Sequence, residues 1–537
     1  MKLLKSIFSV WLIATVVACS NKIEYGPDPY AGGLEDLGIS FEDASPSPTR
    51  ARVGATVLFQ VDGLLKYKDE LKFYVNNIEA EVTTLTDSTL TVIVPDHASS
   101  GSVRVVVQGQ VFAGPYLPII GKLGIDATFQ PGIGTNGSIT TIKQLSSANG
   151  NKIFIAGEFT DYNGTSASTK INGIAAITNS GELDRTVNFG EGLENGNVNS
   201  IVEVGAGNII LAGNFASYNK INNIKNITRI NAGGALSTQV VDILNLTDDP
   251  AYSTLTVPTF NGGTESTILS VFYQNNKLYA IGGFKAYTDN YYERSTYDNI
   301  LSDFFPMGNV VRMNVDGSLD STYYIKKEGV KSVGLAGVNG VVNGGHLQSD
   351  GKLVMIGSFT RFNNANEVGR ILRLSTTGDI DATFQSGTGA NGSIFRINYS
   401  AALDKYVIVG NFTKYNGQDA RNIAVLNSDG SLDTSFQSLG FAGGTPSFAY
   451  QMSNGLIVVT GTFGSYGGIV REGLLVLDRD GRLSADYNNS GKFTGYAYDA
   501  LEGVNSLNQK TLTLVGYISA FNGTNSIGNI VRLAFQN

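Results

Sequence analysis

Few residues of this sequence have the types and spacing needed for acid–base, nucleophilic or metal chemistry. The 537 residues include two histidines, His97 and His346, and one cysteine, Cys19. Neither histidine has a serine or cysteine nucleophile motif nearby, and the two fall in different predicted domains. Zinc sites need several Cys or His ligands at short, characteristic spacings. The sequence therefore predicts no catalytic residues, no metal site and no cofactor.

Carboxylates are more numerous, with 46 Asp and Glu residues. A pair of acids for glycoside hydrolysis can come from distant parts of a chain, so this alternative stays open. Many acids stand in turns where Asp precedes Gly, at Asp316, Asp350, Asp429 and Asp480. The run "DRDGRLSAD" at 478–486 lacks the third spaced oxygen ligand and the terminal Glu of a calcium loop. We interpret these acids as turn residues and expect no enzyme activity.

An aromatic and polar segment at 287–309, "YTDNYYERSTYDNILSDFFPMGN", suggests binding rather than reaction. Aromatic faces can stack on the C–H surfaces of sugars, while Asp, Asn and Arg can hydrogen-bond hydroxyls. Tyrosine is also a low-entropy anchor in protein interfaces. The predicted ligand-binding residues are Tyr287, Tyr291, Tyr292, Arg294, Tyr297, Phe304 and Phe305. The alternative is that the segment caps the fold and buries its own aromatic side chains.

A repeated octapeptide indicates which elements would carry this segment. "GEFTDYNG" at 157–164 recurs as "GSFTRFNN" at 357–364 and "GNFTKYNG" at 410–417. The seven copies begin at Gly157, Gly213, Gly282, Gly357, Gly410, Gly461 and Gly516. Each follows an apolar, β-rich run and precedes a second such run and a Gly turn, with no helical periodicity. Units of roughly 50–60 residues with about four strands are the size of propeller blades. The repeat therefore predicts a seven-bladed β-propeller at 121–537.

The ends of this region predict that the ring closes. The chain stops at "NIVRLAFQN", where other units continue into a Gly turn and a further short run. The missing piece, "GIDATF", stands at 124–129 and should complete the last blade, which removes an open sheet edge. The first aromatic of each octapeptide is expected to fill the space between blades, and the second to close the turn.

Two inserts flank the third octapeptide, at 240–267 and 287–309, and account for its longer spacings. Loops on a rigid scaffold are where binding specificity usually resides. This is a second reason to place a ligand at 287–309.

The N-terminus resembles an export signal. Lys2 and Lys5 precede "SIFSVWLIATVVA", an apolar run too short for a comfortable membrane span. "VVAC", ending at Cys19, resembles the bacterial lipobox, which implies that Cys19 becomes the lipid-modified N-terminus. An ordinary signal peptide is the alternative. We predict a signal peptide at 1–18 and a lipid-anchored tether at 19–36.

Two further resemblances cover most of the chain. "DATFQSGTGANGSI" with "GNFTKYNG" and "IAVLNSDGSLDTSF" resembles the delta-60-type bacterial propeller repeat, a family of mostly unknown function. Residues 37–120, with "TLTVIVP" and "SGSVRVVV", resemble the TIG-type immunoglobulin-like module. The resemblances imply an all-β protein, in which a small immunoglobulin-like β-sandwich is followed by a seven-bladed β-propeller.

This combination resembles Bacteroidetes outer-surface lipoproteins, many of which accompany SusC/SusD-like glycan uptake systems. The resemblance implies an outer-membrane lipoprotein that faces the cell exterior and binds polysaccharide without catalysis. The net charge of −8 and the lack of a Lys/Arg cluster argue against nucleic acid as a partner. Two alternatives stay open, namely a protein–protein scaffold of the envelope and a propeller-type polysaccharide hydrolase or lyase.

Overall fold

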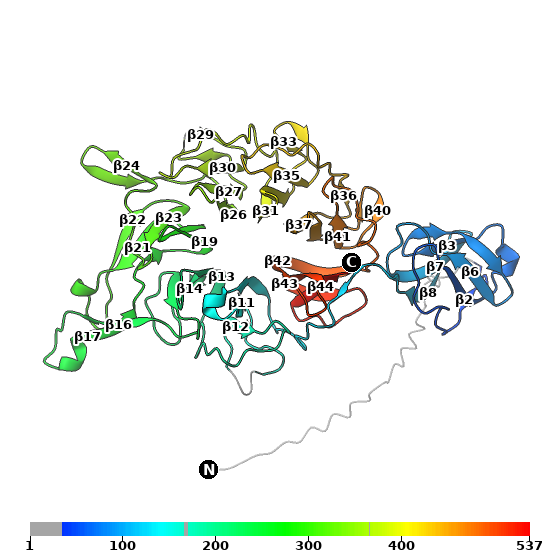
Figure 1. Ribbon diagram of the computed structural model, residues 1–537, viewed down its shortest axis with the longest axis horizontal. Coiled ribbons are helices and arrows are strands. Elements are labelled where there is room, and N and C mark those ends of the chain that lie inside the picture. Colours follow the sequence, from blue (N-terminus) through cyan, green and yellow to red (C-terminus); the bar gives the residue numbers. More distant parts are fainter. Residues whose placement is uncertain (1–34, 166–169, 365, 537) are drawn as a thin grey trace, which may run out of the picture.

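The computed structural model describes residues 35–165, 170–364 and 366–536, which form a β-sandwich followed by a β-propeller (Figure 1). The predicted signal peptide, most of the tether and Cys19 lie outside the described residues. The described part has almost no helix beyond four short 3-10 turns, at Leu65–Tyr67, Ser147–Asn149, Pro250–Tyr252 and Tyr292–Arg294. The all-β prediction is confirmed.

The sandwich consists of two four-stranded sheets. One has the order β1 (Ser40–Phe41), β2 (Thr56–Asp62), β6 (Thr89–Ile93) and β5 (Val82–Leu85), and the other β4 (Ile78–Ala80), β3 (Lys72–Val75), β7 (Gly101–Val107) and β8 (Gln110–Leu117). Burial alternates along β2 and β7, as expected for strands with one face on a core. Phe59 and Phe73 pack against each other in this core, with ring centroids 5.1 Å apart.

Seven sheets, counted over the described residues, form the blades of the propeller. In chain order their strands are β10 (Ile139–Gln144), β11 (Ile153–Gly157) and β12 (Ile174–Ile177); β13 (Gly196–Glu203), β14 (Ile209–Phe215) and β15 (Ile227–Ile230); β19 (Ile268–Gln274), β20 (Lys277–Gly282) and β23 (Val310–Asn314); β26 (Val342–Leu347), β27 (Leu353–Gly357) and β30 (Ile371–Leu374); β31 (Ile394–Ser400), β32 (Lys405–Gly410) and β35 (Ile423–Asn427); β37 (Pro446–Gln451), β38 (Ile457–Gly461) and β41 (Leu474–Leu477); and β42 (Phe493–Val504), β43 (Lys510–Phe521) and β44 (Ile530–Phe535).

The second strand of each blade is a continuous apolar run because both of its faces are covered by neighbouring blades. β11, β27 and β38 are buried at every residue. The first six blades continue into a fourth segment that makes one isolated bridge, such as Leu374 with Ile380. In the seventh blade the fourth strand is β9 (Leu123–Ile125), where Leu533 lies opposite Ile125. The predicted closure of the ring is confirmed.

The smaller strands lie in the connections between these blade strands. They form β16 (Thr238–Asp242) with β17 (Thr254–Pro258); β18 (Gly263–Thr264) with β21 (Ala286–Asn290) and β22 (Ser302–Pro306); β24 (Ile325–Glu328) with β25 (Lys331–Gly334); β28 (Arg361–Phe362) with β29 (Asn366–Glu367); β33 (Lys414–Tyr415) with β34 (Gln418–Asp419); and β36 (Phe441–Ala442) with β39 (Ser465–Tyr466) and β40 (Ile469–Val470). In Figure 1 the hairpins β16–β17 and β24–β25 reach outward from the ring.

The octapeptide aromatics pack within and between blades, as predicted. The first aromatics are at most 3% exposed and the second at most 4%. Five second-position tyrosines each donate from the hydroxyl to the carbonyl of a turn glycine at 2.5–3.1 Å, with the pairs Tyr162–Gly181, Tyr218–Gly234, Tyr287–Gly317, Tyr415–Gly430 and Tyr466–Gly481. These turn glycines have φ of 88–98°, which side-chain-bearing residues rarely adopt. The second aromatic therefore ties the octapeptide loop to the turn that follows the third strand.

Loss of one such tie should be measurable. Tyr415→Phe keeps the buried ring and removes the hydroxyl that bonds the Gly430 carbonyl. We expect the free energy of unfolding to fall by about 1–2 kcal/mol, because a buried carbonyl loses its partner. Tyr273→Phe is the control, since it removes an exposed bond to Asn276 and should cost far less. Equal losses in the two variants, measured by denaturant unfolding, would contradict this role.

The sandwich is hydrogen-bonded to the sixth and seventh blades. The Ser100 amide donates to the Asn489 carbonyl at 2.9 Å, and the Asn489 side chain donates to the Ala98 carbonyl at 3.0 Å. The Arg471 guanidinium, which is buried, donates to the His97 carbonyl at 3.0 Å. These contacts fix the sandwich beside the blade strands β42–β44, where Figure 1 shows it.

Candidate functional site

Three of the predicted ligand-binding residues are packed into the protein. Tyr287 is 4% exposed and makes the structural tie to Gly317. Tyr292 is 8% exposed, packs with Ile243 and Val257, and accepts a hydrogen bond from the Asn290 side chain at 3.0 Å. Phe305 is half-buried against the core of the third blade. The side chains of Tyr287 and Tyr292 are therefore not available to a ligand.

The other four predicted residues are open to solvent to different degrees. The Arg294 guanidinium lies over the ring of half-buried Tyr291, 4.9 Å from its centroid. Tyr297 is 48% exposed and meets Tyr252 edge to face, with centroids 4.9 Å apart. Phe304 is 61% exposed. Ligand binding at this insert stays a prediction for Tyr291, Arg294, Tyr297 and Phe304.

A second candidate site is a cavity at the centre of the ring. The inner strands of all seven blades, β10, β13, β19, β26, β31, β37 and β42, line a cavity of about 1210 Å³. Small-molecule sites are usually about 300–1,000 Å³, so this central channel exceeds the usual volume of such a site.

Short polar side chains connect neighbouring inner strands around the channel. The Asn199 side chain donates to the Ile268 carbonyl at 2.9 Å, and the Asn343 side chain to the Ile394 carbonyl at 2.7 Å. In each pair an inner-strand side chain reaches the backbone of the next blade. These residues hold the wall together and use their donors in doing so.

Asp499 makes the same kind of connection between the seventh and first blades. Its Oδ2 accepts hydrogen bonds from the Thr141 hydroxyl and the Ile142 amide, each at 3.0 Å. Burial raises the pKa of Asp499, while these hydrogen bonds oppose the rise. Glu203, also in the wall, accepts hydrogen bonds from the Ser146 amide at 2.9 Å and from the Asn149 side chain. Both carboxylates are therefore occupied by the protein.

Arg396 is the exception in this wall. Its guanidinium makes only a long contact, 3.4 Å, to the Phe395 carbonyl, and no carboxylate of the described residues lies within 4.0 Å. Burial lowers the pKa of Arg396, and Asp499 acts against this shift. The Lys143 ammonium also lines the channel and makes no hydrogen bond or ion pair within the described chain, although its charge favours the ionised forms of Glu203 and Asp499. The channel thus contains two cationic side chains whose donors are largely unused.

Tyr450 and Tyr498 line the same part of the channel, on the sixth and seventh blades. Neither hydroxyl has a hydrogen-bond partner among the residues that the structure describes. Burial raises the pKa of Tyr450 to about 12, with Glu502 and Asp499 adding to the shift, so its hydroxyl stays protonated at neutral pH. Across the channel, Ser200, Ser270 and Gly344 are small and leave the space open.

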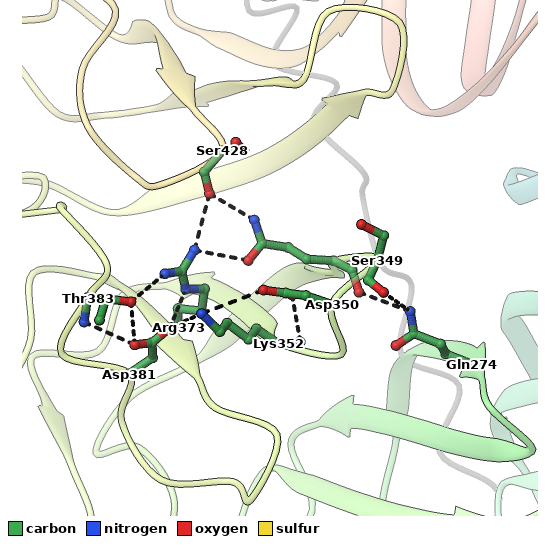
Figure 2. Close-up of polar contacts among 9 residues, drawn as sticks. Gln274, Ser349, Asp350, Lys352, Arg373, Asp381, Thr383 and Ser428 are labelled. Carbon is green, nitrogen blue, oxygen red and sulfur yellow. Dashed lines mark hydrogen bonds and ion pairs between the residues drawn. The ribbon is translucent and has the colours of Figure 1, made fainter.

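One mouth of the channel is braced by a polar network that crosses three blades (Figure 2). The Gln274 side chain, from the third blade, donates to the Ser349 carbonyl of the fourth at 2.7 Å. The Gln348 side chain then donates to the Ser428 carbonyl of the fifth at 2.8 Å and accepts from Arg373 at 3.1 Å. This network ties the third, fourth and fifth blades together at the ends of β19 and β26.

The two histidines do not form a catalytic site. His97 lies in the sandwich, while His346 stacks on Tyr399 with centroids 4.2 Å apart and meets Tyr406 edge on. Burial lowers the pKa of His346 to about 4, so it is neutral at physiological pH. No group of three or more metal-ligating side chains occurs in the described ranges.

Burial of His346 should make the protein sensitive to acid. Between pH 6.5 and 4 the unfolded chain binds a proton at this histidine that the folded chain does not. The free energy of unfolding should therefore fall by about 1.4 kcal/mol per pH unit across this window, or about 3 kcal/mol in all, and stay unaffected above it. Denaturant unfolding of His346→Phe should show a shallower fall than the natural protein. The same slope in both would contradict the assignment.

The sequence analysis missed the channel because its residues lie outside the repeated octapeptide. The sequences of the inner strands differ from blade to blade, so they do not form a recognisable repeat. Aligned on their shared bulge, they place Thr141, Ser200, Ser270, Gly344, Arg396, Phe448 and Asp499 at one level. Arg396 is the single cation of this set, and that alignment could have singled it out.

Two families of unknown function match parts of the chain. Residues 15–115 match a family described as a domain of unknown function (DUF5008). Residues 348–384 and 404–436 match a domain of unknown function (DUF5122) described as a β-propeller. These two stretches of the repeat are thus similar to a propeller family whose function is unknown. No curated protein matches the chain.

Solved structures with a similar arrangement have low sequence identity. The WD40 β-propeller domain of Doa1 matches at 12% identity and a TM-score of 0.40, covering 77% of this chain and 97% of that one. Auxiliary nutrient binding proteins from Bacteroides thetaiotaomicron and Bacteroides ovatus match at 11% and 12% identity, with TM-scores of 0.32 and 0.29; each match covers 92% of this chain and 99% of the other. At these TM-scores the function has to be argued from the residues of this chain.

No helix in the described part of the chain is long and apolar enough to cross a membrane.

Proposed function

We propose that this protein is a non-catalytic binding protein of the bacterial cell surface that holds a glycan in its central channel. The observation that carries the proposal is a roomy cavity lined by two tyrosines and two cations with unused donors. Tyrosine rings can stack on a sugar ring, and free N–H donors can hydrogen-bond its oxygen atoms and so fix its orientation. The wall carboxylates Asp499 and Glu203 are held by hydrogen bonds within the protein, which favours binding over acid–base chemistry.

A glycan panel tests this proposal. Full-length protein is run through native gels that contain single polysaccharides, beside the channel variants Tyr450→Ala and Tyr498→Ala and the insert variants Tyr291→Ala and Tyr297→Ala. We expect at least one glycan to retard the natural protein and the channel variants to move freely. Retardation lost only in the insert variants would move the site to residues 287–309, and retardation by no glycan would overturn the proposal. New reducing ends released from a retarding glycan would favour the hydrolase alternative.

The proposed location is the outer membrane, with Cys19 as the lipid-bearing residue and SusC/SusD-like transport components as partners. In this arrangement the sandwich, fixed beside the sixth and seventh blades, separates the propeller from the anchor. Cys19→Ala should move the protein from the membrane fraction to the soluble fraction of cells, and protease added to intact cells should cleave the natural protein. Membrane retention of the variant would contradict lipidation at this residue.

A second candidate function, an envelope scaffold, is favoured by one feature of the first insert. The β16–β17 hairpin exposes apolar side chains on its first strand and in its connecting loop, with Val240 68% and Leu246 81% exposed. Apolar side chains gathered on a projecting hairpin are typical of a protein contact. Envelope proteins that co-purify with the natural chain, but not with a Val240→Ser/Leu246→Ser variant, would support this function.

A further inference from the structure

The channel has an imbalance between donors and acceptors. On the acceptor side, Asp499 and Glu203 already take hydrogen bonds from amides, a hydroxyl and a side-chain amide. On the donor side, Arg396 and Lys143 have no acceptor closer than the 3.4 Å contact of Arg396 to a backbone carbonyl. A guanidinium has five N–H donors, so most of those on Arg396, which lines the cavity, have no partner among the described residues.

The position of Arg396 also departs from the pattern of the wall. At the corresponding level, Ser200 and Asp499 use their side chains to bond the backbone of the next blade. The fifth blade makes its connection through Asn398 instead, whose side chain accepts from the Gln451 amide at 3.0 Å. Arg396 is therefore not needed to join the fifth and sixth blades, and its charge is left for the channel.

We infer that the ligand of the channel is an acidic glycan, and that Arg396 binds the carboxylate of a uronic acid unit, with Lys143 as a second cation. The inference rests on the proposed function and names its substrate class. A planar guanidinium fits a carboxylate through two parallel hydrogen bonds. Tyr498, which lines the same channel on the seventh blade, would face the sugar ring that carries this group. Tyr450 would donate to a hydroxyl farther along the channel.

Calorimetric titration of the full-length protein provides the test. The probes are oligogalacturonate, oligoglucuronate and oligoguluronate of equal length, the neutral oligogalactose of that length, and free galacturonic acid. We expect one acidic oligomer to bind at least about tenfold more tightly than the neutral one, and binding to weaken as salt is raised. Free galacturonic acid should bind weakly, because it occupies only part of a cavity of about 1210 Å³.

Variants of Arg396 separate charge recognition from general channel binding. Arg396→Gln should weaken binding of the acidic oligomer about 10- to 100-fold, the range for a lost charged hydrogen bond, and Arg396→Lys should recover part of the loss. Arg361→Gln, which changes the exposed residue of β28, is the matched control and should bind like the natural protein. Unfolding curves of each variant show whether the fold is retained.

The outcomes distinguish the two proposals. Neutral and acidic oligomers that bind equally, or an Arg396→Gln variant that binds the acid as well as the natural protein, would overturn this inference and leave glycan binding in place. Equal affinity for free galacturonic acid and its oligomer would assign the channel to small carboxylates and overturn the glycan assignment. Binding of none of the probes, together with no retardation in the gels, would overturn both.

Discussion

A chain that ends at Asn529 should fail to form the propeller. This truncation removes β44, whose residues Ile530, Val531, Leu533, Ala534 and Phe535 are all at most 5% exposed. Burying each of the four larger side chains contributes about 1.5–3 kcal/mol, so the loss is about 6–12 kcal/mol. A whole domain is stable by only about 5–15 kcal/mol.

The truncation also opens the ring. β44 is paired with β43 on one side and with β9 on the other, so without it the N-terminal strand of the propeller has no partner. Circular dichroism and limited proteolysis of the truncated protein should show loss of the cooperative fold. A chain that ends at Gln536 keeps β44 and is the control. If the truncated protein unfolds at the same temperature as the full-length protein, the closure of the ring through β9 and β44 is contradicted.

The fold could be predicted because its causes are repeated in the sequence. Each octapeptide follows a buried apolar strand, and every copy carries the glycine and the second aromatic, while the first aromatic is replaced by Ile518 in the seventh copy. The last unit lacks the piece that follows the third strand in the other units, and a matching piece stands at 124–129. This pairing predicts that the two ends of the propeller region close the ring. The first six blades have three strands rather than the four that the repeat predicts, because their fourth segment pairs through a single bridge, such as Leu374 with Ile380.

The candidate site was harder to predict because its residues are not repeated. Tyr287 belongs both to an octapeptide and to the predicted binding insert. Its hydroxyl donates to the Gly317 carbonyl, which is the bond that the other octapeptide tyrosines make, so its role is structural. Tyr292 is predicted as a ligand-binding residue because local sequence cannot show that Ile243 and Val257, from the other insert, cover it. Arg396 and Asp499 come together only when seven inner strands close around one axis. That arrangement is a property of the ring and not of any single segment.

The second large effect is expected where Arg373 and Asp381 form a buried ion pair in the fourth blade (Figure 2). The Arg373 Nε lies 2.8 Å from Asp381 Oδ2, with side chains 7% and 8% exposed, and Lys352 Nζ lies 3.1 Å from the same oxygen. Burial alone would raise the pKa of Asp381, but hydrogen bonds from Thr383 and the charges of Lys352 and Arg373 hold it below its usual value. Arg373→Val or Asp381→Ser should each lower the free energy of unfolding by about 3–5 kcal/mol, because one buried charge loses its main partner.

The sixth blade supplies the matched control for this pair. Its Ser484 amide bonds the Val476 carbonyl as the Asp381 amide bonds the Arg373 carbonyl, so Val476 and Ser484 occupy the corresponding positions without charge. The double variant Arg373→Val/Asp381→Ser recreates that pair, and Lys352 can still reach Asp350 at 3.5 Å. We expect the double variant to be more stable than either single variant, with a coupling energy of at least about 2 kcal/mol from denaturant unfolding. Additive losses would show that the two charges act independently, and that the blade depends on each side chain for packing rather than on their pairing.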